Sequence, residues 1–193
     1  MKRICVFAGS SRGRRTEYRD AAEGLGQALL RRRLGLVYGG GRVGLMGVLA
    51  DAMLAGSGEV IGVIPEAMVS KEVAHAGIPD LRVVRTMHER KALMADLSDG
   101  FIALPGGWGT FEELFEILTW AQLGLHRKPC GLLNVEGYFD PLIQLVEHAV
   151  IEGFLGAEFR SMLAVSSSAE EVLDRLASAV PPAVEKWIDR AEV

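Results

Sequence analysis

The chain has 193 residues, of which 49% are hydrophobic and 24% are charged, and its formal net charge is −4. A chain of this length buries a large core as one domain. Its weakly acidic balance argues against nucleic-acid-binding and membrane-surface proteins, because both usually carry a strong basic excess. No apolar run approaches the roughly 20 residues that span a bilayer, and the first residues show no signal-peptide pattern. Cys5 and Cys130 both lie in apolar runs, so we expect reduced, buried thiols and a cytoplasmic protein.

Short apolar runs alternate with longer segments of helical periodicity along the chain. The expected strands are 2–8, 34–39, 59–65, 81–85, 100–104, 129–135 and 162–166. The expected helices are 16–33, 44–56, 86–98, 110–124, 139–152 and 169–179. The strands are nearly continuous runs of Val, Ile, Leu and Ala, as in a parallel sheet that helices cover on both faces. This order predicts an α/β fold with a doubly wound parallel sheet, in a single domain over 1–193 whose residues 180–193 form a terminal helix or tail.

Ligands of such sheets bind at the carboxyl ends of the strands, so we expect the binding residues in the loops that follow the strands. The loop Gly39–Gly44 reads G-x-G-x-x-G, and Glu66 follows about 20 residues later, as in dinucleotide-binding proteins where an acid binds the ribose. The alternative is that these glycines only allow a tight turn and close packing of the next helix. The residues alone leave both interpretations open.

A second glycine-rich loop, Pro105–Thr110, joins an apolar strand to a helix expected to begin at Thr110. The free N–H groups at a helix start and the positive end of its dipole form a phosphate site that needs no basic side chain. Thr110 and Glu113 also have the spacing of a capping box. Phosphate binding and helix capping are both consistent with this loop.

Glu113 lies almost opposite the main apolar stripe of the helix 110–124. That stripe consists of Phe111, Leu114, Phe115 and Leu118. The side of the helix that carries Glu113 becomes apolar at Trp120, one turn after Glu116, so we expect Glu113 in a covered cleft or beside a subunit contact. Capping and catalysis remain equally open roles for this acid.

Arg90 falls inside the apolar stripe of the helix 86–98. A buried guanidinium needs an anionic partner, which is a structural carboxylate, a catalytic carboxylate or a ligand phosphate. Lys91 adds a second positive charge beside it. Thr86 and Glu89 form a capping-box pattern that starts the helix here and places Arg90 near the ligand edge of the sheet.

Other conspicuous residues carry less information. The four histidines lack the spacing of metal ligands, so we expect no metal site. Arg12, Arg14 and Arg15 follow the first expected strand, where they either contact phosphate or lie in solvent. No GxSxG, Walker A or nucleophilic cysteine context appears.

Four segments are informative together: GGGRVGLMG (39–47), TMHERK (86–91), PGGWGTFEE (105–113) and TWAQLG (119–124). They resemble the LONELY GUY family of cytokinin-activating phosphoribohydrolases, which often carry a lysine-decarboxylase-like label. The resemblance spans roughly residues 2–155. It implies a Rossmann-like fold, a homodimer, and cofactor-free hydrolysis of the N-glycosidic bond of adenosine-type nucleoside 5′-monophosphates to a free base and ribose 5-phosphate.

The resemblance also implies site residues. The arginine and glutamate that match the catalytic pair of the family are Arg90 and Glu113. The residues that it places around the substrate are Glu72, Arg90, Lys91, Gly106, Gly107, Trp108, Gly109, Thr110, Phe111, Glu112, Glu113 and Thr119. Trp108 stands where the family often has Tyr, so an aromatic ring is retained. No lysine lies in a recognisable pyridoxal-phosphate context.

This chemistry suits the residue types at these positions. Glycosidic cleavage passes through an oxocarbenium-like state, and the Glu113 carboxylate can stabilise its charge, position the attacking water and accept a proton. The helix 110–124 is apolar nearly all round after its second turn, so it must be buried on more than one side; we expect one side to meet the sheet and the other a second subunit. The alternatives are a non-hydrolytic nucleotide carrier, which has no need of the pair Arg90 and Glu113, and an NAD-linked enzyme using Gly39–Gly44 and Glu66.

Overall fold

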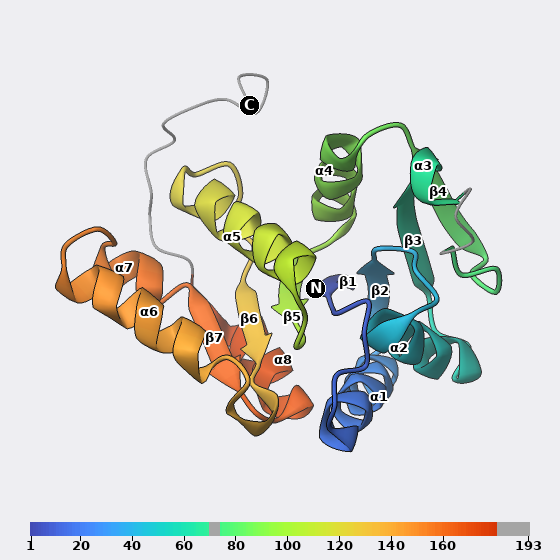
Figure 1. Ribbon diagram of the computed structural model, residues 1–193, viewed down its shortest axis with the longest axis horizontal. Coiled ribbons are helices and arrows are strands. Elements are labelled where there is room, and N and C mark those ends of the chain that lie inside the picture. Colours follow the sequence, from blue (N-terminus) through green and yellow to red (C-terminus); the bar gives the residue numbers. More distant parts are fainter. Residues whose placement is uncertain (70–73, 181–193) are drawn as a thin grey trace.

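The computed structural model describes residues 1–69 and 74–180. Seven parallel strands form one sheet in the order β4-β3-β2-β1-β5-β6-β7 (Figure 1). They are β1 (Arg3–Phe7), β2 (Gly35–Tyr38), β3 (Val60–Pro65), β4 (Asp80–Val84), β5 (Gly100–Ala103), β6 (Cys130–Leu133) and β7 (Leu163–Ser166). The predicted doubly wound parallel sheet is confirmed, with every expected strand present.

Helices lie between successive strands, and a last one, α8, follows β7. They are α1 (Thr16–Arg31), α2 (Gly44–Ala55), α3 (Glu66–Val69), α4 (Met87–Leu97), α5 (Trp108–Gln122), the 3-10 helix η1 (Val135–Gly137), α6 (Asp140–Ile151), α7 (Ala157–Arg160) and α8 (Ala169–Ser178). All six predicted helices are confirmed. The short α3, η1 and α7 were not predicted, because three or four residues carry no readable periodicity. Of the expected terminal segment 180–193, the residues from 181 onwards lie outside the described ranges.

Two apolar layers form the core, one on each face of the sheet. In β1, Ile4 and Val6 pack with α1, α2 and α8, whereas Cys5 and Phe7 pack with α4, α5 and α6 (Figure 1). Because neighbouring residues of a strand point to opposite faces, a strand covered on both sides must be apolar throughout. Cys5 and Cys130 are buried and free, as expected. Within 1–69 and 74–180, no helix has the length and apolar character to cross a membrane.

The strand order reverses beside β1, which pairs with β2 on one edge and with β5 on the other. The helix that follows β1 covers one face of the sheet and the helix that follows β5 covers the other. The two loops therefore separate at the carboxyl edge and leave a crevice, which is where ligands of doubly wound sheets bind. The loops touch at its base, where Gly9 donates its N–H to the carbonyl of Pro105 at 3.1 Å.

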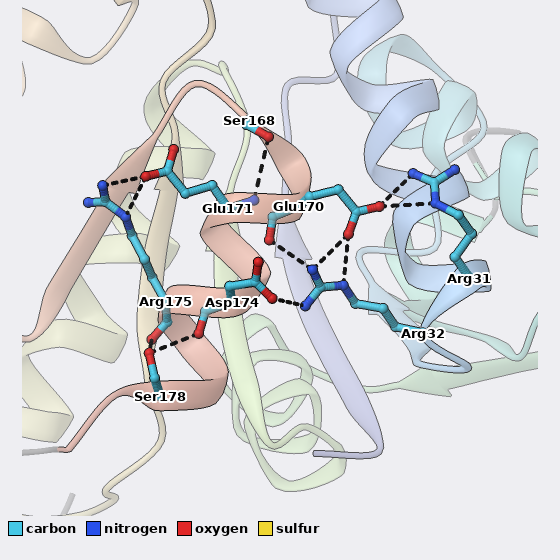
Figure 2. Close-up of polar contacts among 8 residues, drawn as sticks. All are labelled: Arg31, Arg32, Ser168, Glu170, Glu171, Asp174, Arg175 and Ser178. Atoms are coloured by element: carbon cyan, nitrogen blue, oxygen red, sulfur yellow. Dashed lines mark hydrogen bonds and ion pairs between the residues drawn. The ribbon is translucent and has the colours of Figure 1, made fainter.

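An ion-pair network fastens α8 to the end of α1 (Figure 2). Arg31 and Arg32 each place a guanidinium nitrogen 2.7 Å from a different oxygen of Glu170, and Arg32 also lies 2.7 Å from Asp174. A carboxylate shared by two arginines forms a network, which contributes more than an isolated surface pair. Hydrogen bonds from both arginines lower the pKa of Glu170.

We predict that Glu170→Ala lowers the free energy of unfolding by about 1 kcal/mol, because the substitution removes the carboxylate that both arginines share. Asp174→Ala, which removes one contact, costs less. Since the pKa of Glu170 is lowered in the folded chain, the contribution is present at neutral pH and is lost as the pH falls through that pKa. Urea denaturation in low and high salt measures the effect, which salt should reduce. A loss that is equal at both salt concentrations contradicts the ionic explanation.

Candidate active site

The two charged residues singled out in the sequence meet on the face of the sheet that α4 and α5 cover. Nη1 of Arg90 lies 2.9 Å from Oε1 of Glu113, and the two side chains are only 10% and 9% exposed. Nε of Arg90 donates to the carbonyl of Val63, on β3, at 3.1 Å. The expected burial of Arg90 beside an anionic partner is confirmed, and the partner is the carboxylate of Glu113.

The start of α4 is fixed by a side-chain cap, and this sets the position of Arg90. Oγ1 of Thr86 accepts the N–H of Glu89 at 3.1 Å, and the carboxylate of Glu89 accepts the N–H of Arg85 at 2.8 Å. The cap predicted from Thr86 and Glu89 is therefore present. Because side chains of a helix three and four positions apart share a face, Arg90 lies above Met94 on the buried side of α4.

Gly39, the first glycine of the G-x-G-x-x-G pattern, makes room for Arg90. A Cβ atom at this position would overlap Nη2 of Arg90. Gly44 has a φ of +66°, and a Cβ there would overlap backbone atoms of the Gly9–Ser11 segment. Glu66, the candidate ribose acid, is exposed at the start of α3. The structure thus supports the packing interpretation of these glycines rather than dinucleotide binding.

Burial and neighbouring charges set the ionisation of Glu113. Burial raises its pKa above the ordinary value, Arg90 opposes that rise, and the nearby Glu112 adds to it. Lys91 is also buried and pairs with Glu112 and, at 2.9 Å, with Glu116. Burial works against the charge of Lys91, but the two carboxylates raise its pKa. The cluster therefore holds three carboxylates against two cations.

The predicted orientation of α5 was wrong. The residues buried on α5 are Thr110, Glu113, Leu114, Ile117 and Ala121, whereas Phe115, expected in the core stripe, is 41% exposed. Glu113 therefore lies on the buried side of the helix, not opposite to it. The helix is apolar on nearly every side, so its periodicity does not identify the side that faces the sheet. Near its start the buried side is polar, where Glu113 pairs with Arg90.

The start of α5 also differs from the prediction. The helix begins at Trp108 with Gly107 as its N-cap, and no side chain caps it. The capping box of Thr110 and Glu113 is therefore wrong, which removes capping as the explanation of Glu113. Thr110 is buried against Gly106, where a Cβ atom would overlap its hydroxyl. The capping pattern misled because glycine is also an accepted N-cap residue, and Gly107 takes that position here.

A cavity of about 230 Å³ lies beside this loop at the switch point of the sheet. Gly106 and Gly107 line it on one side, and the loop Gly9–Gly13 lines it on the other, with Arg12 contributing a positive charge. Of the three arginines that the sequence left open, Arg12 is the one at the cavity, whereas Arg15 lies 3.0 Å from Glu136. Tyr18 and Tyr138 complete the wall, and no sequence pattern pointed to them.

The remaining predicted substrate residues are dispersed. Trp108 is 89% exposed and meets Phe111 edge to face, with ring centroids 6.4 Å apart. Gly109 has open space around it. Thr119 lies apart from Glu113 in a pocket between α5 and α6, where its hydroxyl donates to the carbonyl of Phe115 at 2.7 Å. Glu72 lies outside the described residues.

Comparison with known proteins identifies the family. A family model described as "Possible lysine decarboxylase" matches residues 46–176, more than half of the chain. The chain is 50% identical over 180 residues to the probable cytokinin riboside 5′-monophosphate phosphoribohydrolase LOGL3 of Oryza sativa subsp. japonica. This match covers 93% of the present chain and 85% of the rice protein. It is 53% identical over 178 residues to the cytokinin riboside 5′-monophosphate phosphoribohydrolase of Rhodococcoides fascians, covering 92% and 90% of the two chains.

The chain belongs to the LONELY GUY family. The resemblance seen in its four motifs is thereby confirmed, with relatives that match nearly the whole length. The lysine decarboxylase description gains no support from Lys91, the lysine beside the buried pair, because its ammonium group is engaged by Glu112 and Glu116.

Solved structures confirm the Rossmann-like fold. The X-ray structure of TM1055 matches with a TM-score of 0.71 at 21% identity and covers 93% of this chain and 100% of that chain. The molybdenum cofactor binding protein from Rippkaea orientalis matches with a TM-score of 0.69 at 22% identity, covering 92% and 97%. At these identities the likeness concerns the fold alone.

The contact between Gly39 and Arg90 predicts a specific cost. Gly39→Ala should lower the free energy of unfolding by about 2 kcal/mol or more, because the guanidinium must move away from Glu113 and leave a buried charge unpaired. Gly24→Ala in α1 is the matched control. This glycine has open space around it, so the same substitution should raise stability by about 0.5–1 kcal/mol through helix propensity. Urea denaturation measures the free energy of unfolding of both variants, which should fall for Gly39→Ala and rise for Gly24→Ala. If Gly39→Ala leaves it unchanged, the packing argument is contradicted.

Proposed function

We propose that this protein hydrolyses the N-glycosidic bond of adenosine-type nucleoside 5′-monophosphates, including N6-substituted ones, and releases a free base and ribose 5-phosphate. The observation that carries the proposal is the buried Arg90–Glu113 pair, placed near a glycine loop that opens a helix. The same reaction is supported by the relatives named as phosphoribohydrolases, which are 50% and 53% identical over 93% and 92% of the chain.

Glu113 and Arg90 are the proposed catalytic pair. As the bond from C1′ to the base nitrogen breaks, positive charge develops on the ribose, and an ionised carboxylate beside C1′ stabilises it. Water adds to C1′ as Glu113 accepts one of its protons, and the departing nitrogen of the base takes up a proton from solvent. Release of the proton from Glu113 to solvent then restores the carboxylate. Arg90 favours the ionised form of Glu113, whose burial otherwise favours the protonated form.

The start of α5 is the proposed binding site of the 5′-phosphate. Gly106 and Gly107 allow the anion to approach the backbone. The free N–H groups of the first turn of α5 can donate to it, and the positive end of the helix dipole attracts it. Arg12 lines the adjacent cavity and adds a positive charge. The other residues proposed to contact substrate are Glu72, Lys91, Trp108, Gly109, Thr110, Phe111, Glu112 and Thr119.

Product analysis tests the reaction. We predict that the purified protein releases free base and ribose 5-phosphate from AMP and from isopentenyladenosine 5′-monophosphate but not from the corresponding nucleosides. Glu113→Gln should lose at least about 100-fold in turnover, since general-base and charge stabilisation are both removed. Glu171→Gln in α8 is the matched control and should retain activity. Binding of nucleotide without release of base would favour the carrier function, and near-normal turnover of Glu113→Gln would end the catalytic assignment.

The raised pKa of Glu113 predicts the pH dependence. Because the ionised carboxylate is the active form, turnover should fall as the pH drops through a pKa above the ordinary glutamate value of 4.5. Glu112 raises this pKa and Lys91 lowers it. Glu112→Gln should therefore shift the low-pH decline of turnover to lower pH, and Lys91→Gln should shift it to higher pH. If neither variant shifts this decline, it reflects ionisation of the substrate phosphate, whose second pKa is about 6, and not of Glu113.

A homodimer is the proposed assembly. A pocket of about 300 Å³ between α5 and α6 is lined mostly by apolar side chains, among them Phe115, Leu145 and Phe154. Phe154 is 87% exposed, and Leu145 is also exposed. Exposed apolar surface of this kind marks association sites, and α5 buries its opposite side against the sheet.

A cytoplasmic location is proposed from the two free, buried thiols.

Light scattering tests the assembly. Wild-type protein should have twice the mass of the chain, and Leu145→Glu should yield a monomer, because a charge in an apolar interface is left without a partner. Val83→Glu is the matched control, since Val83 is exposed on the edge strand β4, away from α5 and α6. A dilute, fully active wild-type monomer would contradict the proposal.

A further inference from the structure

The turn between β6 and α6 contains two consecutive residues in the left-handed backbone region. Glu136 has a φ of +51° and Gly137 a φ of +69°. This conformation suits glycine but is unfavourable for glutamate, and it persists only where the surrounding structure imposes it. At Gly137, a Cβ atom would also press against the carboxylate of Asp140. The backbone conformation immediately before Tyr138 is therefore fixed.

Four side chains hold this turn in place. Oδ1 of Asn134 accepts the N–H of Phe139 at 2.7 Å, and Nδ2 of Asn134 donates to Asp140 at 2.7 Å. The carboxylate of Glu136 lies 3.0 Å from Nη1 of Arg15, the residue that precedes α1. The turn is closed on itself and tied to the neighbouring loop, so the residue that follows it has a fixed position.

Tyr138 crosses from this turn to the glycine loop. Its ring meets Tyr18 of α1 edge to face at 5.8 Å between centroids, and Phe139 at 5.0 Å. Its hydroxyl donates a hydrogen bond to the carbonyl oxygen of Gly106. The contact joins residues 32 positions apart in the chain, at the wall of the cavity that Gly106 and Gly107 line.

All three carbonyl groups that precede the first turn of α5 accept hydrogen bonds from the protein. Pro105 accepts the N–H of Gly9 at 3.1 Å, Gly106 accepts the hydroxyl of Tyr138, and Gly107 accepts the N–H of Phe111 at 3.1 Å. In a trans peptide, the carbonyl and the following N–H point in opposite directions. Tyr138 therefore fixes the orientation of the peptide between Gly106 and Gly107.

That orientation matters because this peptide joins two glycines. Without Cβ atoms it rotates at little steric cost. A reversed peptide would present a carbonyl oxygen to an anion at the start of the helix, in place of an N–H group, and would repel it. Among the described residues, the hydroxyl of Tyr138 is the hydrogen-bond donor that engages the Gly106 carbonyl and opposes this reversal.

We propose that Tyr138 is a positioning residue for phosphate binding: through the carbonyl of Gly106, it keeps the glycine loop in the conformation that accepts the 5′-phosphate. The strained turn at Glu136 and Gly137 serves to aim the hydroxyl. This inference rests on the proposed function only in that the ligand carries a 5′-phosphate.

The experiment compares Tyr138→Phe with wild type in two titrations by calorimetry. The probes are ribose 5-phosphate, which carries the phosphate, and adenosine, which lacks it; the proposed reaction consumes neither. Because one hydrogen bond is lost and the ring is kept, affinity for ribose 5-phosphate should fall about tenfold, whereas affinity for adenosine should not change. With AMP as substrate, KM should rise by a similar factor and kcat should remain within about twofold of wild type.

Tyr38→Phe is the matched control. It removes the same hydroxyl from a buried tyrosine for which the described part of the chain holds no hydrogen-bond partner, so neither affinity should change. An unchanged affinity for ribose 5-phosphate in Tyr138→Phe overturns the proposal, and so does an equal loss for both probes. A wild type that does not bind ribose 5-phosphate overturns it as well. If wild type binds the phosphate but releases no base from AMP, the proposed function fails while the two titrations still decide the role of Tyr138.

Discussion

The buried ion pair of Arg90 and Glu113 is the constraint on which the arrangement of the site depends. Two charges removed from water cost several kcal/mol unless each finds a close partner, so neither side chain is stable there alone. The surrounding structure is adapted to both. Gly39 leaves space for the guanidinium, and the carbonyl of Val63 accepts one of its hydrogen bonds. The cap at Thr86 fixes the helix that carries the arginine.

The second buried cation changes how the first pair behaves. Lys91 is held between Glu112 and Glu116, so the positive charge beside Glu113 is partly compensated before any substrate arrives. The cluster as a whole is one negative charge in excess. This excess and the burial of Glu113 both favour its protonated form, and Arg90 opposes them. The pKa of Glu113 therefore lies above the ordinary glutamate value even though an arginine is beside it.

The sequence predicted the sheet, the six longer helices and the burial of Arg90. Each of these left a local signal: continuous apolar runs, helical periodicity, and a cation within an apolar stripe. It failed where the signal was ambiguous or distant. The helix α5 is apolar on nearly all sides, so only packing against the sheet shows that Glu113 is buried and Phe115 exposed. The contact of Tyr138 with Gly106 depends on where two loops meet in space, which no local pattern encodes.

The position of β1 at the centre of the sheet has a consequence for how the chain folds. Its first edge is covered by β2, some 30 residues later, but its second edge pairs only with β5, near residue 100. The strands β1 to β4 with α1, α2 and α4 can therefore assemble first, with the far edge of β1 unpaired. Arg90 belongs to this first half and Glu113 to the second. The charge of the arginine is thus neutralised only when the two halves join, and formation of the ion pair coincides with closure of the sheet.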